Sequence, residues 1–187
     1  MKPCAPIGIM IAAVLLLAGC AGMPSGGPRE IHLQHSDTGE RVRTIYWRNG
    51  DYVENAMLEV AVLFRDRRSN DVAAIDPRLI DYLHDLHESV GAAPGTPVVV
   101  TSGYRSRETN GQLGQTNRNV AENSYHIRGK AADVRIPGIA PRRLADAAAA
   151  LRRGGYACYG ESGHVHVDTG PVRTWAVKET PQRLASR

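Results

Sequence analysis

Two short stretches, one after the middle of the chain and one near its end, constrain the fold more than any other feature. The first, Ser124–Asp133 (SYHIRGKAAD), offers one imidazole at His126 and one carboxylate at Asp133. The second, His164–Asp168 (HVHVD), alternates polar residues with valine. Strict alternation is typical of a half-buried strand, so this stretch presents its polar side chains on one face.

The spacing within the first stretch indicates how its polar side chains are presented. Seven positions separate His126 from Asp133, which does not fit the i, i+4 histidine pair of zinc-binding helices. Gly129 lies between them and indicates a turn, so we expect His126 on a loop and Asp133 on a strand over residues 131–136. Two imidazoles and one carboxylate are a ligand set that a catalytic zinc uses, with its fourth position left to water.

These residues resemble a known family. The pattern Ser-x-His-x-x-Gly-x-Ala-x-Asp, followed by a strand bearing His-x-His, is similar to the zinc D-Ala-D-Ala peptidases, whose relatives include phage peptidoglycan endopeptidases and the hedgehog signalling domain. The stretch Thr101–Asn110 resembles that family's arginine-bearing strand end. Ile75–Leu79 and Val165–Trp175 resemble the murein endopeptidase K-like branch in particular. The likeness covers about residues 30 to 176.

The resemblance implies an α+β domain in which helices pack on one face of a small antiparallel sheet, as in the zinc fold of hedgehog and the D,D-peptidases. It also implies that His126, Asp133 and His166 hold a zinc ion. His166 is preferred to His164 because the family's ligand stands immediately before Val-Asp.

The resemblance also indicates residues that contact the substrate. Arg105 follows a predicted strand and would grip a substrate carboxylate, because its planar guanidinium matches a carboxylate in bidentate fashion. Tyr104 and Ser124 lie in the same motifs and are expected at the substrate too. The alternative for Arg105 is a structural role, as a helix cap or a salt-bridge partner.

The proton acceptor stays open between two residues. Many family members carry a glutamate three residues before the last ligand, but that position is Gly163 here. Glu161 lies in the preceding turn and could reach back, whereas His164 shares a strand face with His166. Asp168 is on that face too, where it is better suited to orienting an imidazole.

The function implied by the resemblance is zinc-dependent hydrolysis of peptide cross-links in peptidoglycan, at D-alanyl or diaminopimelyl bonds. The alternative is a non-catalytic, zinc-containing lipoprotein that binds stem peptides. A third interpretation makes Cys158 a nucleophile with His164 as its base. Because Tyr156–Tyr159 has the pattern of a strand, a buried, unreactive cysteine is the better interpretation of Cys158.

The first twenty residues have the features of a bacterial lipoprotein signal. A short positive region at Lys2 precedes the apolar run Ile7–Ala18, which is too short for a permanent membrane span. Leu17–Cys20 (LAGC) resembles a lipoprotein processing box, so we expect removal of residues 1–19 and lipid on Cys20. The alternative is an ordinary signal peptide in which this cysteine is incidental.

A lipid on Cys20 would place the protein in the cell envelope, on the periplasmic face. By resemblance to such lipoproteins, Ala21 beside it favours the outer membrane. Residues 20–30 then form a flexible tether, residues 31–177 a single domain and residues 178–187 a polar tail.

Periodicity predicts the elements of the domain. A hairpin covers residues 31–47 with its turn at Thr38-Gly39. The other expected elements are helices over 53–67, 78–90 and 142–153, strands over 97–101, 131–136, 156–159 and 164–168, and a long polar loop over 107–123 with room for one helical turn.

Composition adds two limits. Apolar residues make up 42% of 187 residues, which suits one globular domain with a real core. The net charge of +4 comes without a basic run interleaved with aromatics, so nucleic acid is not an expected partner. We expect a monomer whose partners are stem peptides and a membrane.

Overall fold

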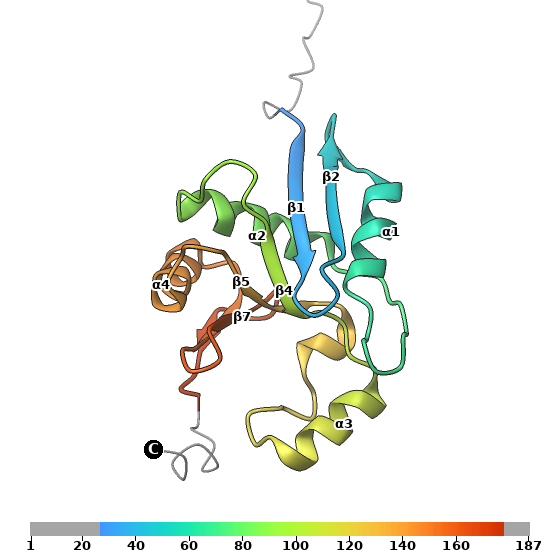
Figure 1. Cartoon of the computed structure of the whole chain (residues 1–187), viewed down its shortest axis with the longest axis vertical. Coiled ribbons are helices and arrows are strands. Elements are labelled where there is room, and N and C mark those ends of the chain that lie inside the picture. Colours follow the sequence, from blue (N-terminus) through green and yellow to red (C-terminus); the bar gives the residue numbers. More distant parts are fainter. Residues whose placement is uncertain (1–26, 178–187) are drawn as a thin grey trace, which may run out of the picture.

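The structure, a computed structural model, describes residues 27–177, which form one mixed sheet with helices packed against it (Figure 1). The strands of the described residues lie in the order β3-β2-β1-β4-β5-β7-β6-β8. They are β1 (Arg29–His35), β2 (Arg41–Arg48), β3 (Asp51–Tyr52), β4 (Val98–Ser102), β5 (Ala131–Arg135), β6 (Gly155–Tyr159), β7 (His164–Asp168) and β8 (Arg173–Thr174). The helices are α1 (Glu54–Leu63), α2 (Pro77–Ser89), α3 (Arg107–Thr116), α4 (Pro141–Leu151) and the 3₁₀-helix η1 (Tyr125–Arg128). The expected α+β class is confirmed.

The sheet is larger and more mixed than the small antiparallel sheet that the sequence predicts. Most neighbouring strands are antiparallel, but β4 runs parallel to β1 and β8 runs parallel to β6. The chain between β3 and β4 crosses over through α1 and α2, and such a crossover returns a strand in the parallel direction. β8 is only two residues long and adds a short edge beside β6.

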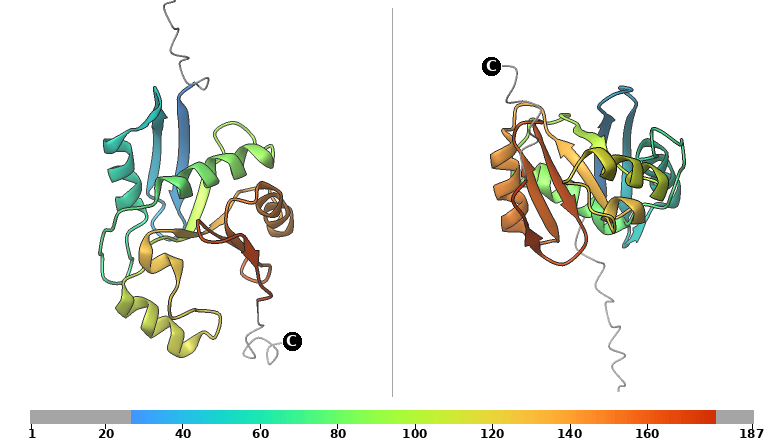
Figure 2. Two further views of the ribbon diagram at one scale, coloured as in Figure 1. Left: turned by 180° about the vertical axis from the view of Figure 1, so that it is seen from behind. Right: turned by 90° about the horizontal axis from the view of Figure 1, so that it is seen from below.

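One hydrophobic core lies between the sheet and the helices α1, α2 and α4 (Figure 2). Alternate residues of the central strands point into it, including Leu33, Val98, Val100, Val134 and Val165. Each such side chain, when fully buried, stabilises the fold by about 1.5–3 kcal/mol. Because successive strand residues face opposite sides, the other face of β5 and β7 is left to polar side chains.

Local sequence signals explain several elements. The predicted hairpin is present as β1 and β2, and Gly39 in its turn has a φ of 71°. Asp76 caps α2 by accepting a hydrogen bond from the backbone N–H of Arg78, as its position before a proline predicts. α1 is shorter than the predicted helix over 53–67, because Phe64 already forms its C-cap.

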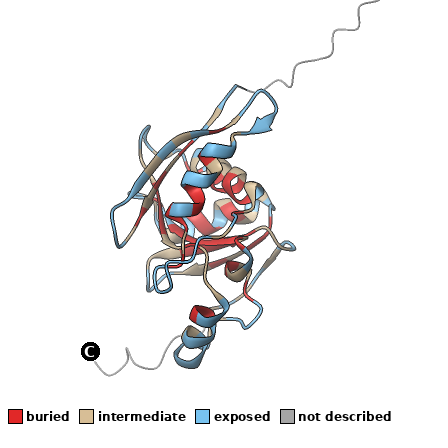
Figure 3. Ribbon diagram, turned by 90° about the vertical axis from the view of Figure 1, so that its right-hand side faces the viewer, coloured by how far each residue is buried: buried red, intermediate tan, exposed pale blue. Residues whose placement is uncertain are grey.

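The sequence predicts a long polar loop over 107–123. The structure instead begins this segment with the ten-residue helix α3. Its N-terminus is capped by Ser106, whose Oγ accepts from the N–H of Thr109 at 3.1 Å. Asp66 accepts from the N–H of Ser106 at 2.7 Å and ties α3 to the loop after α1. Only Thr109 and Asn110 of α3 are buried, so this helix, at the bottom of Figure 3, carries no apolar stripe.

The expected signal peptide over 1–19, the lipidated Cys20, most of the tether and the tail over 178–187 lie outside the described residues. Within the described part, β1 begins at Arg29, two residues before the predicted start of the domain. No helix of residues 27–177 is both long enough and apolar enough to span a membrane.

Candidate metal centre

His126 reaches the sheet from η1 rather than from an irregular loop. Ser124 caps η1, and its Oγ accepts from the N–H of His126 at 3.3 Å. Gly129 ends η1 with a φ of 63°, and a Cβ there would lie 2.2 Å from the carbonyl oxygen of Ala74. Glycine is therefore required both by the left-handed backbone and by the close approach of a neighbouring segment.

Asp133 and His166 are brought together by strand register. They are directly opposite each other in the antiparallel pair β5–β7, on the face turned away from the hydrophobic core. On the other side of β7, His166 is opposite Ala157, whose small side chain is fully buried. Residues directly opposite on one face have Cβ atoms about 4.5–5.5 Å apart, so this register alone places the two ligands within reach of one ion.

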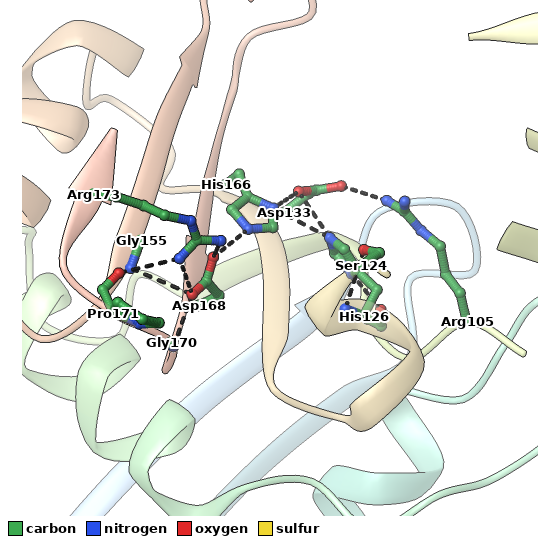
Figure 4. Close-up of polar contacts among 11 residues, drawn as sticks. Arg105, Ser124, His126, Asp133, Gly155, His166, Asp168, Gly170, Pro171 and Arg173 are labelled. Carbon is green, nitrogen blue, oxygen red and sulfur yellow. Dashed lines mark hydrogen bonds and ion pairs between the residues drawn. The ribbon is translucent and has the colours of Figure 1, made fainter. Parts of the chain in front are cut away.

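Three ligand atoms converge at this point (Figure 4). Nδ1 of His166 lies 2.9 Å from Oδ1 of Asp133 and 3.2 Å from Nε2 of His126. The same Nε2 lies 3.3 Å from Oδ1 of Asp133. Tetrahedral zinc with ligand bonds of about 2.0–2.1 Å separates its ligand atoms by about 3.3 Å, so the donor set fits a metal ion of this kind. All three residues are buried.

Each imidazole is oriented by a hydrogen bond on the side away from the centre. Nδ1 of His126 donates to the carbonyl oxygen of Gly103 at 2.7 Å, and Nε2 of His166 donates to Oδ2 of Asp168 at 3.1 Å. Because a carbonyl and a carboxylate oxygen can only accept, the remaining ring nitrogens are free to bind a cation. Asp168 thus orients an imidazole, the role that the sequence favours for it.

Arg173 fixes Asp168 in turn. Its guanidinium donates to both carboxylate oxygens, Nη1 to Oδ1 at 2.9 Å and Nη2 to Oδ2 at 2.8 Å. The same guanidinium lies over the rings of Tyr125 and Trp175, and Trp175 meets His166 edge to face. A Cβ on Gly155 would lie 2.3 Å from Nη1 of Arg173, so glycine leaves room for this pair.

Sequence reasoning assigned no role to Arg173 or Trp175. Both lie in the stretch after Asp168 that resembles the murein endopeptidase K-like branch, and that likeness was the signal that could have found them.

Electrostatics favour an ionised carboxylate between the two imidazoles. Burial alone would raise the pKa of Asp133, but its contacts with His126 and His166 hold that pKa well below its usual range. Burial lowers the pKa of His126. Burial also acts to lower the pKa of His166, but the carboxylates of Asp133 and Asp168 outweigh it and raise that pKa. The centre therefore offers a cation one negative charge and two oriented nitrogens.

Of the three predicted substrate residues, two lie at the candidate centre or its cleft and one packs against the hydrophobic core. Arg105 lies beside the centre, where Nη2 donates to Oδ2 of Asp133 at 2.7 Å and Nε donates to Oγ of Ser102 at 2.9 Å. Ser124 lines the cleft above the centre as well as capping η1. Tyr104 instead packs against the hydrophobic core, and it is not among the residues that line the cleft.

The centre opens into a cleft of about 1000 Å³. One wall is formed by the segment between α3 and η1, and the other by the β6–β7 turn together with residues 175–177. His164 lines this cleft on the same face of β7 as His166, and its ring stacks on that of Tyr159 at 4.6 Å. Glu161 is exposed on the rim. Both candidate proton acceptors thus belong to the cleft.

Cys158 is a free thiol in β6 that packs against the hydrophobic core. In register it is opposite Val165, whereas Tyr159 is opposite His164, so the cysteine and this histidine lie on different faces of the sheet. The thiol is half-buried and also lines the cleft, so it is more exposed than the buried cysteine that the sequence favours, but its strand position does not pair it with His164. Among residues 27–177, His126, Asp133 and His166 form the only group of three or more potential ligands that could hold a metal ion.

Comparison with known proteins agrees with this geometry. A family model described as "Peptidoglycan L,D-endopeptidase MepK" matches residues 23–175. The peptidoglycan L,D-endopeptidase MepK of Escherichia coli (strain K12) is 38% identical over 164 residues, which cover 88% of this chain and 89% of that protein. The probable peptidoglycan L,D-endopeptidase MepK of Haemophilus influenzae is 37% identical over 148 residues, or 79% of each chain. The chain therefore belongs to the peptidoglycan L,D-endopeptidase MepK family of peptidases.

Proposed function

We propose that this protein is a zinc-dependent murein endopeptidase that hydrolyses peptide cross-links of peptidoglycan. Family membership supports a metal-dependent peptidase that acts on peptidoglycan. The observation that carries the proposal is the convergence of Nε2 of His126, Oδ1 of Asp133 and Nδ1 of His166 within 3.3 Å of one another, below an open cleft.

His126, Asp133 and His166 would hold the zinc ion, with a coordination position left open towards the cleft. When bound, zinc polarises a carbonyl group and lowers the pKa of a water molecule to about 7. The protein contributes rigid ligands: the Gly103 carbonyl and the Asp168–Arg173 pair hold the two imidazoles before any substrate arrives.

The remaining chemistry is assigned to residues of the cleft. A proton must leave the attacking water, and we propose Glu161 or His164 as its acceptor, since both line the cleft. Arg105 would contact the substrate from its position beside Asp133, and Ser124 from the wall above His126.

The protein would act in the cell envelope, on the periplasmic face, where peptidoglycan is found. We propose that lipid on Cys20 anchors the protein to a membrane. The apolar run and the LAGC box at the N-terminus support this anchor. Outer-membrane placement and a monomeric state belong to the same proposal.

Digestion of purified, cross-linked sacculi by the zinc-loaded protein tests the proposed function. We expect release of monomeric muropeptides, loss of release when a chelator removes the metal, and recovery when zinc is added. Binding to sacculi with zinc present but without any cleavage would contradict the peptidase. That result would instead favour a non-catalytic module that binds stem peptides.

A further inference from the structure

Three arginines line the cleft, and two of them are held by carboxylates of the protein itself. Arg105 donates to Asp133 at 2.7 Å, so its guanidinium already lies in an ion pair. Arg173 binds both oxygens of Asp168. A substrate carboxylate that approached either arginine would have to compete with a protein carboxylate for the same N–H donors.

Arg118 differs from these two. It lines the cleft and is exposed, and within residues 27–177 its side chain makes no hydrogen bond or ion pair. Its positive charge is therefore free to meet an anion that enters the cleft.

The segment that carries Arg118 is held in place by its own backbone and by α3. Asn117 forms a turn, because its Oδ1 accepts from the N–H of Asn119 at 2.9 Å and its carbonyl accepts from the N–H of Val120 at 3.1 Å. Nδ2 of the buried Asn110 donates to the carbonyl of Ala121 at 3.0 Å. Arg118 lies inside this turn, so its backbone is held at a defined place on the wall while its long side chain can extend into the cleft.

We propose that Arg118 binds a free carboxylate of the substrate and so helps to select the cross-link that is cut. This proposal rests on the proposed function, because it concerns the substrate of the same cleft. Stem peptides of peptidoglycan carry free carboxylates, at their ends and on diaminopimelate. An unpaired guanidinium on the wall can bind such a group through two parallel hydrogen bonds without breaking a contact inside the protein.

Two synthetic substrates separate this role from general activity. Both contain the same cross-linked peptide, one with free carboxylates beside the scissile bond and the other with those carboxylates converted to amides. We expect the zinc-loaded wild-type protein to cleave the carboxylate form with the higher kcat/KM. Arg118→Gln should lower kcat/KM for that form by about 10- to 100-fold, mainly through KM, because a hydrogen bond to a charged group is lost.

The same variant should cleave the amidated peptide as well as the wild type does. Arg118→Lys keeps the charge but loses the planar fork, so we expect an intermediate loss on the carboxylate form. Arg107→Gln is the matched control: Arg107 is also exposed and unpaired within the described residues, but it lies at the start of α3 and does not line the cleft. It should behave like the wild type on both peptides.

Equal losses on both peptides, or no loss on either, would overturn the role of Arg118 while leaving the peptidase intact. A wild-type protein that cleaves neither peptide nor sacculi would overturn the proposed function and this inference with it.

Discussion

Each histidine of the candidate centre has one ring nitrogen left for an ion. His126 would use Nε2 because its Nδ1 is bound to the carbonyl of Gly103, and His166 would use Nδ1 because its Nε2 is bound to Asp168. Such partners fix both the tautomer and the ring orientation. Both hydrogen bonds are buried with the residues that make them, so the ligands are ordered by the fold before an ion arrives.

Replacing Asp133 tests the ligand set directly. Asp133→Ala removes the one negative charge of the centre, so we expect the zinc content of the purified protein to fall from about one ion per chain to almost none. Metal analysis after dialysis measures this. Asp146→Ala is the control, since Asp146 is an exposed aspartate of α4. An unchanged zinc content in Asp133→Ala would remove this residue from the ligand set.

Two conservative variants distinguish the candidate proton acceptors. Glu161→Gln and His164→Gln should both retain zinc, because neither residue is a proposed ligand. The variant that removes the true acceptor should lower kcat by about 10²- to 10⁴-fold, and the other should stay close to the wild type. The kinetics of cross-link cleavage, measured beside zinc content, give the answer. If kcat is unchanged in both variants, neither residue accepts the proton.

Among the elements, β5 and β7 show how one register serves two purposes. Ala132 and Val134 face the core, while Asp133 between them faces the cleft opposite His166. A slip of one residue would exchange the two faces and bury the ligands among apolar side chains. The core therefore fixes the register, and the register fixes the metal centre.

The contribution of the junction between the α1–α2 loop and α3 to the stability of the fold should depend on pH, because Asp66 lies at this junction. Burial alone would raise its pKa, but hydrogen bonds from Thr109 and from the N–H groups of Ser106 and Arg68 lower it. A carboxylate with a folded pKa below its unfolded value of about 3.9 stabilises the fold at neutral pH. That contribution is lost as the pH falls below about 4 towards the folded pKa.

Asp66→Asn should therefore cost about 1–3 kcal/mol in free energy of unfolding at pH 7 and less at pH 3. Urea denaturation of the variant and the wild type at both pH values measures the difference. Asp71→Asn, at an exposed aspartate of the same loop, should show only a small effect at either pH. A cost for Asp66→Asn that is the same at pH 7 and pH 3 would exclude an ionised Asp66 as its source.

The whole molecule is arranged as a sheet with one face for stability and the other for the cleft. The helices α1, α2 and α4 cover the first face, whereas η1 and the segment after α3 form part of the cleft at the second (Figures 1 and 2). The proposed metal ligands come from η1, β5 and β7, and they are brought together only when the chain folds.

Zinc should therefore stabilise the folded protein as a whole. A ligand that binds only the folded state adds about 4 kcal/mol at a free concentration one thousand times its Kd, which raises Tm by roughly 10 °C in a domain of this size. Thermal unfolding with zinc and with a chelator measures the shift. Asp133→Ala should show almost no shift, and a shift equal to that of the wild type would place the zinc elsewhere.

Much of this fold could be predicted from the sequence where local signals are strong. The alternation of His164–Asp168, the turn at Gly39 and the cap at Asp76 each depend on neighbouring residues alone, and each appears as predicted. α3 was missed because its boundaries come from the cap at Ser106 and from a distant aspartate, and not from an apolar period. β8 was missed because two residues form a strand only beside a partner.

The candidate metal centre, too, could be predicted from the sequence only in part. By itself, the sequence determined which side chains can be ligands, and that His164, His166 and Asp168 share one strand face, because residue type and period are local properties. Only the tertiary structure decided which ring nitrogens could face an ion, that Arg105 and Arg173 are paired, and that Arg118 has no partner among residues 27–177. Hydrogen-bond partners from segments far apart in the chain settle these points, and such partners are defined only after the sheet has brought the segments together.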